Sequence, residues 1–142
     1  KAAARFAIDG HFDGFIGLGG GSSLDTAKAA NLYSTYPADF FDYVNAPIGG
    51  GVPVPGPLKP MIGIPTTAGT GSETTGVVIF DYEEMHAKTG IAHRLLRPHL
   101  GIVDPDNTKT LPPMAAASTG FGSGSRWSRP PCDRVTWSST WP

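Results

Sequence analysis

Charge, cysteine and long apolar runs are all scarce in this sequence. Charged residues make up 16% of the 142 residues and the formal net charge is −1, so no basic surface for nucleic acid or for an anionic membrane is expected. The single cysteine, Cys132, excludes a disulfide framework and favours a reducing compartment. No apolar run reaches the length that crosses a bilayer. These absences predict a soluble chain with no nucleic-acid partner and no membrane partner.

The length suits one compact domain rather than two. The chain begins with Lys1 instead of methionine. We therefore expect that the N-terminal part of the protein, with any targeting peptide, is missing from this sequence.

Glycine and proline, by contrast, are abundant. Nineteen glycines and fourteen prolines follow no collagen-like period and separate short apolar runs, which is typical of functional loops between strands. Residues 15–18 predict a strand, residues 19–22 a glycine turn and residues 23–33 a helix. Residues 61–64 predict a second strand, which leads into a loop of small residues, 66–72.

The remaining pattern also alternates between helices and strands. Residues 1–8 resemble the end of a helix, residues 39–43 favour one helical turn, and a helix opens at residue 111 with proline in its first turn. Further strands are predicted for residues 76–81, 87–92 and 100–103. This alternation predicts an α/β fold.

The turn at residues 19–22 has the chemistry of an anion site. Glycine lets the backbone approach a ligand closely, and the first N–H groups of the following helix carry about half a positive charge. A diphosphate fits this position. A plain tight turn capped by Ser22 explains the same residues, and the glycines alone do not separate the two hypotheses. Because open α/β sheets bind ligands beyond the carboxyl ends of their strands, we expect residues 19–22 and 66–72 to converge there.

Two of these segments resemble the motifs of one enzyme family. Residues 19–28, GGGSSLDTAK, resemble the Gly-Gly-Gly-Ser-x-x-Asp-x-x-Lys motif of the iron-containing (group III) alcohol dehydrogenases, and residues 65–73, PTTAGTGSE, resemble that family's second cofactor loop. The resemblance runs over about residues 6–121 and is greatest to the hydroxyacid-oxoacid transhydrogenase branch. Two long motifs in the family's order make it highly specific.

The resemblance implies an incomplete Rossmann-like nucleotide-binding domain of the dehydroquinate synthase type, without the family's helical metal-binding domain. It implies NAD(H) or NADP(H) as the cofactor, and iron or zinc as the divalent metal of an intact family member. The first loop would hold the dinucleotide diphosphate, the second would contact the adenine and diphosphate side, and a lysine in a following strand would face the nicotinamide. The implied cofactor-binding residues are Gly20, Gly21, Ser22, Thr66, Thr67, Thr70 and Lys88.

Other polar residues favour structural roles. Asp25 lies early in the predicted helix, where a carboxylate complements the helix dipole, and a direct active-site role is the alternative. Glu73 serves either in catalysis or in capping backbone donors of its own loop. The four histidines lack the i, i+4 spacing of a helical metal site, so we interpret them as surface residues: His11, His86, His93 and His99.

The sequence departs from the family after residue 121. The family's metal ligands begin with a Gly-Phe-Asp or Gly-Val-Asp step and a histidine four residues after the aspartate, but Gly122 and Arg126 occupy these positions here. Neither binds a hard cation, so we predict no metal ligand and no catalytic residue in this chain. Residues 1–121 are predicted to form a partial nucleotide-binding domain and residues 122–142 a non-homologous, irregular tail. A frameshift, a mis-spliced exon or a truncated gene model explains this change better than divergence into a pseudoenzyme.

The resemblance finally implies an oxidoreductase that transfers a hydride between a hydroxyacid or alcohol and a nicotinamide cofactor. In the transhydrogenase branch, 4-hydroxybutyrate is oxidised to succinate semialdehyde while 2-oxoglutarate is reduced to 2-hydroxyglutarate, in the mitochondrion. The intact protein is expected to bind these small molecules and to form a homo-oligomer. The alternatives are a general iron-dependent alcohol dehydrogenase and an inert, non-catalytic nucleotide-binding fragment.

Overall fold

The computed structural model describes residues 1–83, 86–115 and 136–137. Apart from the helical turn expected at residues 39–43, strands and helices occur where the sequence predicts them, to within two residues at each end, which confirms the α/β class. Residues 113–115 are helical, as expected for the segment that opens near residue 111. In chain order the elements are α1 (Ala2–Asp9), β1 (Phe15–Gly19), α2 (Gly21–Thr35), β2 (Met61–Pro65), β3 (Val77–Tyr82), β4 (Ala87–Ala92), the 3-10 helix η2 (Arg94–Leu96), β5 (Leu100–Ile102), the 3-10 helix η3 (Pro105–Thr108) and β6 (Thr136–Trp137).

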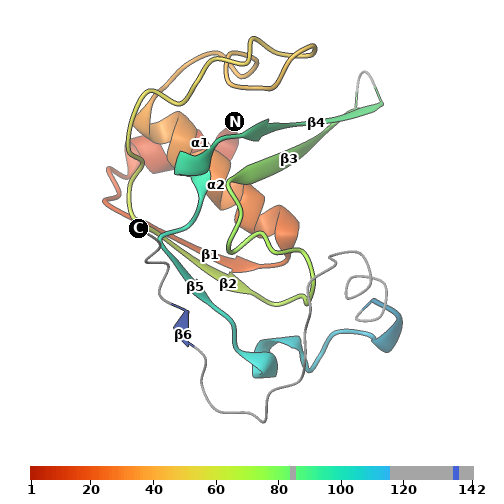
Figure 1. Ribbon diagram of the computed structural model, residues 1–142. Helices are drawn as coiled ribbons and strands as arrows, with labels where there is room; N and C mark the ends of the chain where they lie inside the picture. The colour runs from red at the N-terminus through yellow and green to blue at the C-terminus, as the bar shows by residue number, and fades with distance from the viewer. Residues whose placement is uncertain (84–85, 116–135, 138–142) are drawn as a thin grey trace.

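Strands β1, β2 and β5 form a parallel sheet, with β6 antiparallel beside β5 (Figure 1). Phe15 lies opposite Met61 and Gly19 opposite Pro65, so β1 and β2 begin and end together. Strands β3 and β4 form a separate antiparallel hairpin. The loops that follow β1 and β2 therefore leave the sheet at the same edge.

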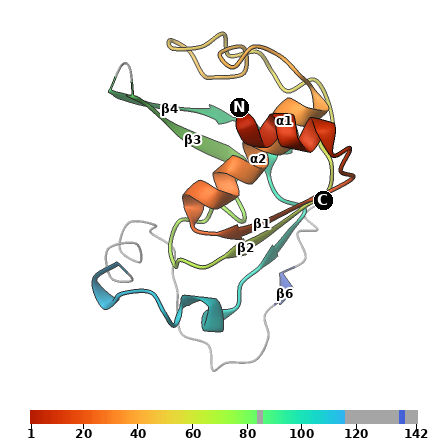
Figure 2. The same ribbon diagram turned by 180° about the vertical axis from the view of Figure 1, so that it is seen from behind.

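Helix α2 lies between the parallel sheet and the hairpin, with α1 beside it (Figures 1 and 2). Its Leu24 is fully buried over two strand glycines: a Cβ added at Gly17 would lie 3.0 Å from Leu24 Cδ2, and one at Gly63 would lie 3.6 Å from it. Glycine at these strand positions lets the helix approach closely. The opposite face of β1 carries Ile16 and Leu18, which are 70% and 60% exposed.

A second apolar cluster lies between α2 and the hairpin. Val78 of β3 and Ile91 of β4 face each other and are buried against Leu32 of α2. The long connection between α2 and β2 contributes to this core, although its sequence predicts mostly loop. The buried members of the cluster are Leu32, Tyr43, Val44, Val54, Val78, Ile91 and Leu96.

Residues 39–43 form a hydrogen-bonded turn and no helix, contrary to the sequence-based expectation. The Asp39 backbone N–H donates to Asp42 Oδ2 at 3.0 Å, and the Phe41 N–H donates to Asp39 Oδ1 at 3.0 Å. Aspartate side chains that bind nearby backbone groups compete with helix formation in this way.

The predicted tail, residues 122–142, lies outside the described residues except for Thr136 and Trp137. These two pair with Ile102 and Gly101 of β5, so at these positions a short strand replaces the expected irregular structure. Among the described residues, no helix combines the length and the hydropathy that crossing a bilayer requires.

Tyr33 of α2 provides a test of the second cluster. Its hydroxyl donates to the Phe40 carbonyl oxygen at 2.6 Å. Burial, followed by the neighbouring Tyr43, Asp42 and Asp39, raises the pKa of Tyr33 to about 12. This raised pKa means that the contribution of Tyr33 to stability is complete below pH ~10, the pKa of an unfolded tyrosine, and is lost as the pH rises towards the folded value.

We predict that a spectrophotometric titration of the folded chain shows one tyrosine that ionises near pH 12. Tyr33→Phe should remove the absorbance change of this tyrosine. Tyr36→Phe is the matched control, because it removes a phenol from the same helix end and leaves the Tyr33 hydroxyl in place. Retention of the full absorbance change in the Tyr33→Phe variant would contradict the packing described here.

Candidate functional site

The first glycine loop joins β1 directly to α2. Gly20 is the N-cap and the helix begins at Gly21, two residues earlier than predicted, so the expected cap, Ser22, lies exposed in the first helical turn. Gly19 has φ 142°, and a Cβ there would lie 2.6 Å from Ser23 Oγ. Only glycine therefore fits position 19. The first N–H groups of a helix lack intrahelical partners; in α2 that of Ser23 already donates to the Gly20 carbonyl oxygen at 3.1 Å, so this applies to Gly21 and Ser22.

The second loop follows β2 and lies against the first, which confirms that the two loops converge. The Thr66 N–H donates to the Gly19 carbonyl oxygen at 2.9 Å. A Cβ at Gly20 would lie 3.4 Å from Thr67 Cγ2, and one at Gly21 would lie 3.3 Å from Thr70 Cγ2. Five of the predicted cofactor residues thus meet at the carboxyl ends of two neighbouring parallel strands, where open α/β sheets bind ligands.

Thr67 has a polar atom that the packing of the described residues leaves unsatisfied. Its Oγ1 is buried, and no group in the described part of the chain forms a hydrogen bond with it. A buried hydroxyl without a partner costs about 1–3 kcal/mol, so such atoms in proteins require an explanation. A ligand oxygen above Gly20 would supply the missing partner.

Lys88 lies apart from these loops, on the β3–β4 hairpin. Its side chain is 79% exposed, and its Nζ lies 3.7 Å from Asp81 Oδ1. Lys88, Val77 and Ile79 line a shallow pocket of about 330 Å³ beside residues 45–48. Val77 and Ile79 are 38% and 54% exposed, so this face of the hairpin combines an exposed cation, paired with Asp81, with an apolar surface.

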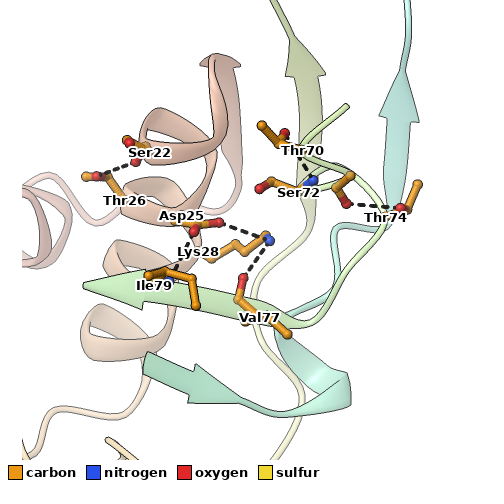
Figure 3. Close-up of polar contacts among 10 residues, drawn as sticks. Ser22, Asp25, Thr26, Lys28, Thr70, Ser72, Thr74, Val77 and Ile79 are labelled. Atoms are coloured by element: carbon orange, nitrogen blue, oxygen red, sulfur yellow. Dashed lines mark hydrogen bonds and ion pairs between the residues drawn. The ribbon is translucent and has the colours of Figure 1, made fainter. Parts of the chain in front are cut away.

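Two charged residues of α2 are buried beneath the second loop (Figure 3). Lys28 is fully buried; its Nζ donates to the Val77 carbonyl oxygen at 2.9 Å and lies 3.4 Å from Asp25 Oδ1. Asp25 Oδ2 accepts from the Ile79 N–H at 3.1 Å. Burial lowers the pKa of Lys28, while Asp25 and, more weakly, Glu73 oppose this shift.

This arrangement corrects the interpretation of Asp25. The carboxylate lies beyond the first helical turn and binds a strand, so the helix dipole is not its main partner. Sequence reasoning assigned no role to Lys28. The i, i+3 spacing of Asp25 and Lys28 on the buried face of α2 was the available signal.

Glu73 is also buried, 8% exposed, at the end of the second loop. Its Cα lies 3.2 Å from the position of a Cβ at Gly63, and its Cγ lies 3.4 Å from that of a Cβ at Gly101. The residue therefore packs directly on β2 and β5. The end of the second loop therefore packs against the parallel sheet.

The described histidines serve local structure or lie at the surface. The His93 side chain accepts from the Leu95 N–H and caps η2, and His99 Nδ1 accepts from the Met61 N–H at 3.3 Å. His11 and His86 are exposed. Within residues 1–83, 86–115 and 136–137, no three His, Cys, Asp or Glu side chains gather as metal ligands would.

The chain belongs to the iron-containing alcohol dehydrogenase family, whose model matches residues 1–105. It is 60% identical over 120 residues to a Xenopus tropicalis protein named hydroxyacid-oxoacid transhydrogenase, mitochondrial, and 56% identical over 120 residues to the Homo sapiens protein of the same name. Each alignment covers 84% of this chain and 26% of the relative. The chain thus spans about a quarter of the length of these relatives.

Solved structures of the family share the fold. The sulfoacetaldehyde reductase from Bifidobacterium kashiwanohense, in complex with NAD+, matches with a TM-score of 0.76 at 35% identity, over 84% of this chain and 31% of that one. The iron-containing alcohol dehydrogenase from Thermococcus thioreducens matches with a TM-score of 0.75 at 29% identity, over 84% of this chain and 32% of that one.

We predict that Thr67→Val changes stability and ligand affinity in opposite directions. Valine has nearly the same shape and removes the unpaired hydroxyl, so the free energy of unfolding of the ligand-free chain should rise by about 1 kcal/mol. The affinity for a dinucleotide should fall roughly tenfold, because the ligand loses a buried hydrogen bond. Denaturant unfolding and NADH fluorescence titration measure the two effects. An unchanged affinity would show that Thr67 does not contact the ligand.

Proposed function

We propose that this chain is the dinucleotide-binding part of a mitochondrial hydroxyacid-oxoacid transhydrogenase with NAD(H) as its cofactor. One observation carries the proposal: the Thr67 hydroxyl, which has no partner in the described part of the chain, lies beside Gly20, where the first N–H groups of α2 begin. Identities of 56–60% to the Xenopus and human transhydrogenases support the substrate assignment over a general alcohol dehydrogenase. The NAD+ complex of the reductase supports the cofactor.

The two loops would hold the diphosphate from both sides. Backbone N–H groups at Gly20 to Ser22 donate to its oxygens, and the partial positive charge of the helix N-terminus favours its negative charge. The exposed Ser22 hydroxyl adds a donor. From the other side, the hydroxyls of Thr66, Thr67 and Thr70 reach the adenine and diphosphate portion.

Lys88 would lie on the nicotinamide side of the bound cofactor. The apolar surface of Val77 and Ile79 next to it suits a planar ring, and the exposed ammonium, whose surface pairing with Asp81 is weak, suits a ribose or a carboxylate oxygen. A nicotinamide bound there would supply the hydride acceptor for the oxidation of 4-hydroxybutyrate and, in its reduced form, the hydride donor for the reduction of 2-oxoglutarate. The hairpin's part is to position the ring and to exclude water from one face of it.

The divalent metal of the family does not fit the residues described here. They contain no cluster of three ligating side chains, and the positions of the first family ligands, Gly122 and Arg126, lie outside the described residues. Glycine and arginine supply no ligand for a hard cation. For the polypeptide as written, this favours a second candidate function, a nucleotide-binding module without turnover.

We predict that the chain binds NADH and that Gly20→Val weakens this binding roughly a hundredfold, as expected for the loss of two charge-assisted hydrogen bonds. The valine methyl groups would fill the space beside Thr67 that the diphosphate needs. Isothermal titration with NADH measures the affinity, and Ser34→Ala, at the far end of α2, is the control. Equal affinity in the Gly20→Val variant would refute the proposed site.

We also predict that this chain neither retains a stoichiometric metal nor oxidises 4-hydroxybutyrate, because a metal that polarises the substrate oxygen contributes several kcal/mol to such reactions. The protein used for comparison is a version of the chain whose downstream reading frame has been changed so that an Asp-x-x-x-His step follows Phe121. Metal analysis and product detection are the measurements. Turnover by the chain as written would overturn the prediction, and an inactive restored version would place the defect elsewhere.

A further inference from the structure

The pair Asp25 and Lys28 is the most deeply buried group of charges among the described residues and has no part in the binding roles proposed above. Lys28 is completely buried and Asp25 is 8% exposed. Both lie on α2, within two turns of the first loop. The hydrogen bonds that they form with other elements converge on one strand.

That strand is β3, which follows the second loop. Lys28 Nζ binds the carbonyl oxygen of Val77 and Asp25 Oδ2 binds the N–H of Ile79. Residues two apart in a strand direct their backbone groups to the same edge. Figure 3 shows the two side chains reaching this edge of β3 from α2. The two side chains thus form hydrogen bonds with backbone groups of β3 that would otherwise pair with a neighbouring strand.

The contacts of Lys28 and Asp25 with β3 connect the elements that carry the two loops. The second loop is held at its start by the hydrogen bond from Thr66 to Gly19, and the chain that leaves it is held at the first residue of β3 by the hydrogen bond from Lys28 to Val77. Both anchors lie on β1 or α2, the elements that the first loop connects. Between them, Glu73 packs on the sheet and places a further negative charge near Lys28.

We propose that Lys28 and Asp25 are positioning residues, which fix the second loop at the distance from the first loop that a dinucleotide requires. This inference rests on the proposed function of the two loops. An apolar pair would attach a helix to a hairpin equally well, because the desolvation of two buried charges offsets much of their attraction. The ionic pair also fixes the position of β3 along the helix, because it binds a particular carbonyl group and a particular N–H group.

The test compares the wild-type chain with Lys28→Met and with the double variant Asp25→Asn/Lys28→Met. The asparagine keeps an acceptor for the Ile79 N–H, and the double variant removes both charges of the pair, so it tests the proposal if the single variant folds poorly. Lys59→Met is the matched control, because Lys59 Nζ also donates to a backbone carbonyl oxygen, that of Phe12 at 2.6 Å, outside the two loops. Amide hydrogen exchange, NADH affinity and thermal unfolding are measured for each chain.

We expect the double variant to unfold near the wild-type temperature, to lose amide protection at residues 66–79, and to bind NADH roughly tenfold more weakly, the size of one lost interaction of about 1.4 kcal/mol. Lys59→Met should retain both protection and affinity. Wild-type protection and affinity in the double variant would overturn the proposal. If the wild-type chain itself binds no NADH, the proposed function fails, and the exchange of residues 66–79 in the ligand-free chains still decides whether the pair positions the loop.

Discussion

The close approach of α2 to the parallel sheet is the constraint on which the rest of the structure depends. Leu24 occupies the space that side chains at Gly17 and Gly63 would fill, so the helix lies nearer to β1 and β2 than larger residues would allow. The first loop can then be short, because the helix starts at once where the strand ends. The close packing of the helix also keeps the N-terminus of α2 beside the second loop, which begins at the end of the neighbouring strand β2.

Two lysines of this chain show how burial changes the role of the same side chain. Lys88 and Asp81 are 79% and 73% exposed, and such surface pairs contribute roughly 0–1 kcal/mol because water screens them. The ammonium of Lys88 is therefore available to a ligand. Lys28 is completely buried, and removing its partner would leave an uncompensated charge, a change that costs about 3–5 kcal/mol in other proteins. Its geometry is accordingly tightly defined.

Much of the architecture follows from the sequence because it depends on local patterns. Short apolar runs that end in glycine or proline predict β1 and β2, and the spacing of Leu24, Ala27 and Ala30 predicts α2. The convergence of the two loops follows from a general property of parallel sheets, and family motifs indicate which residues meet there. The limits of α2 and the turn at residues 39–43 were harder to predict, since backbone capping and aspartate hydrogen bonds decide them.

By itself, the sequence determined the family and the order of helices and strands, since each of these is written in contiguous residues. The tertiary structure alone decided that Asp25 and Lys28 bind β3, whose residues lie about fifty positions further along the chain. It alone left the Thr67 hydroxyl, beside Gly20, without a partner among the described residues. The physical reason is that a buried polar group takes whichever partner the packing of distant segments brings within hydrogen-bond distance, and no local pattern specifies that partner.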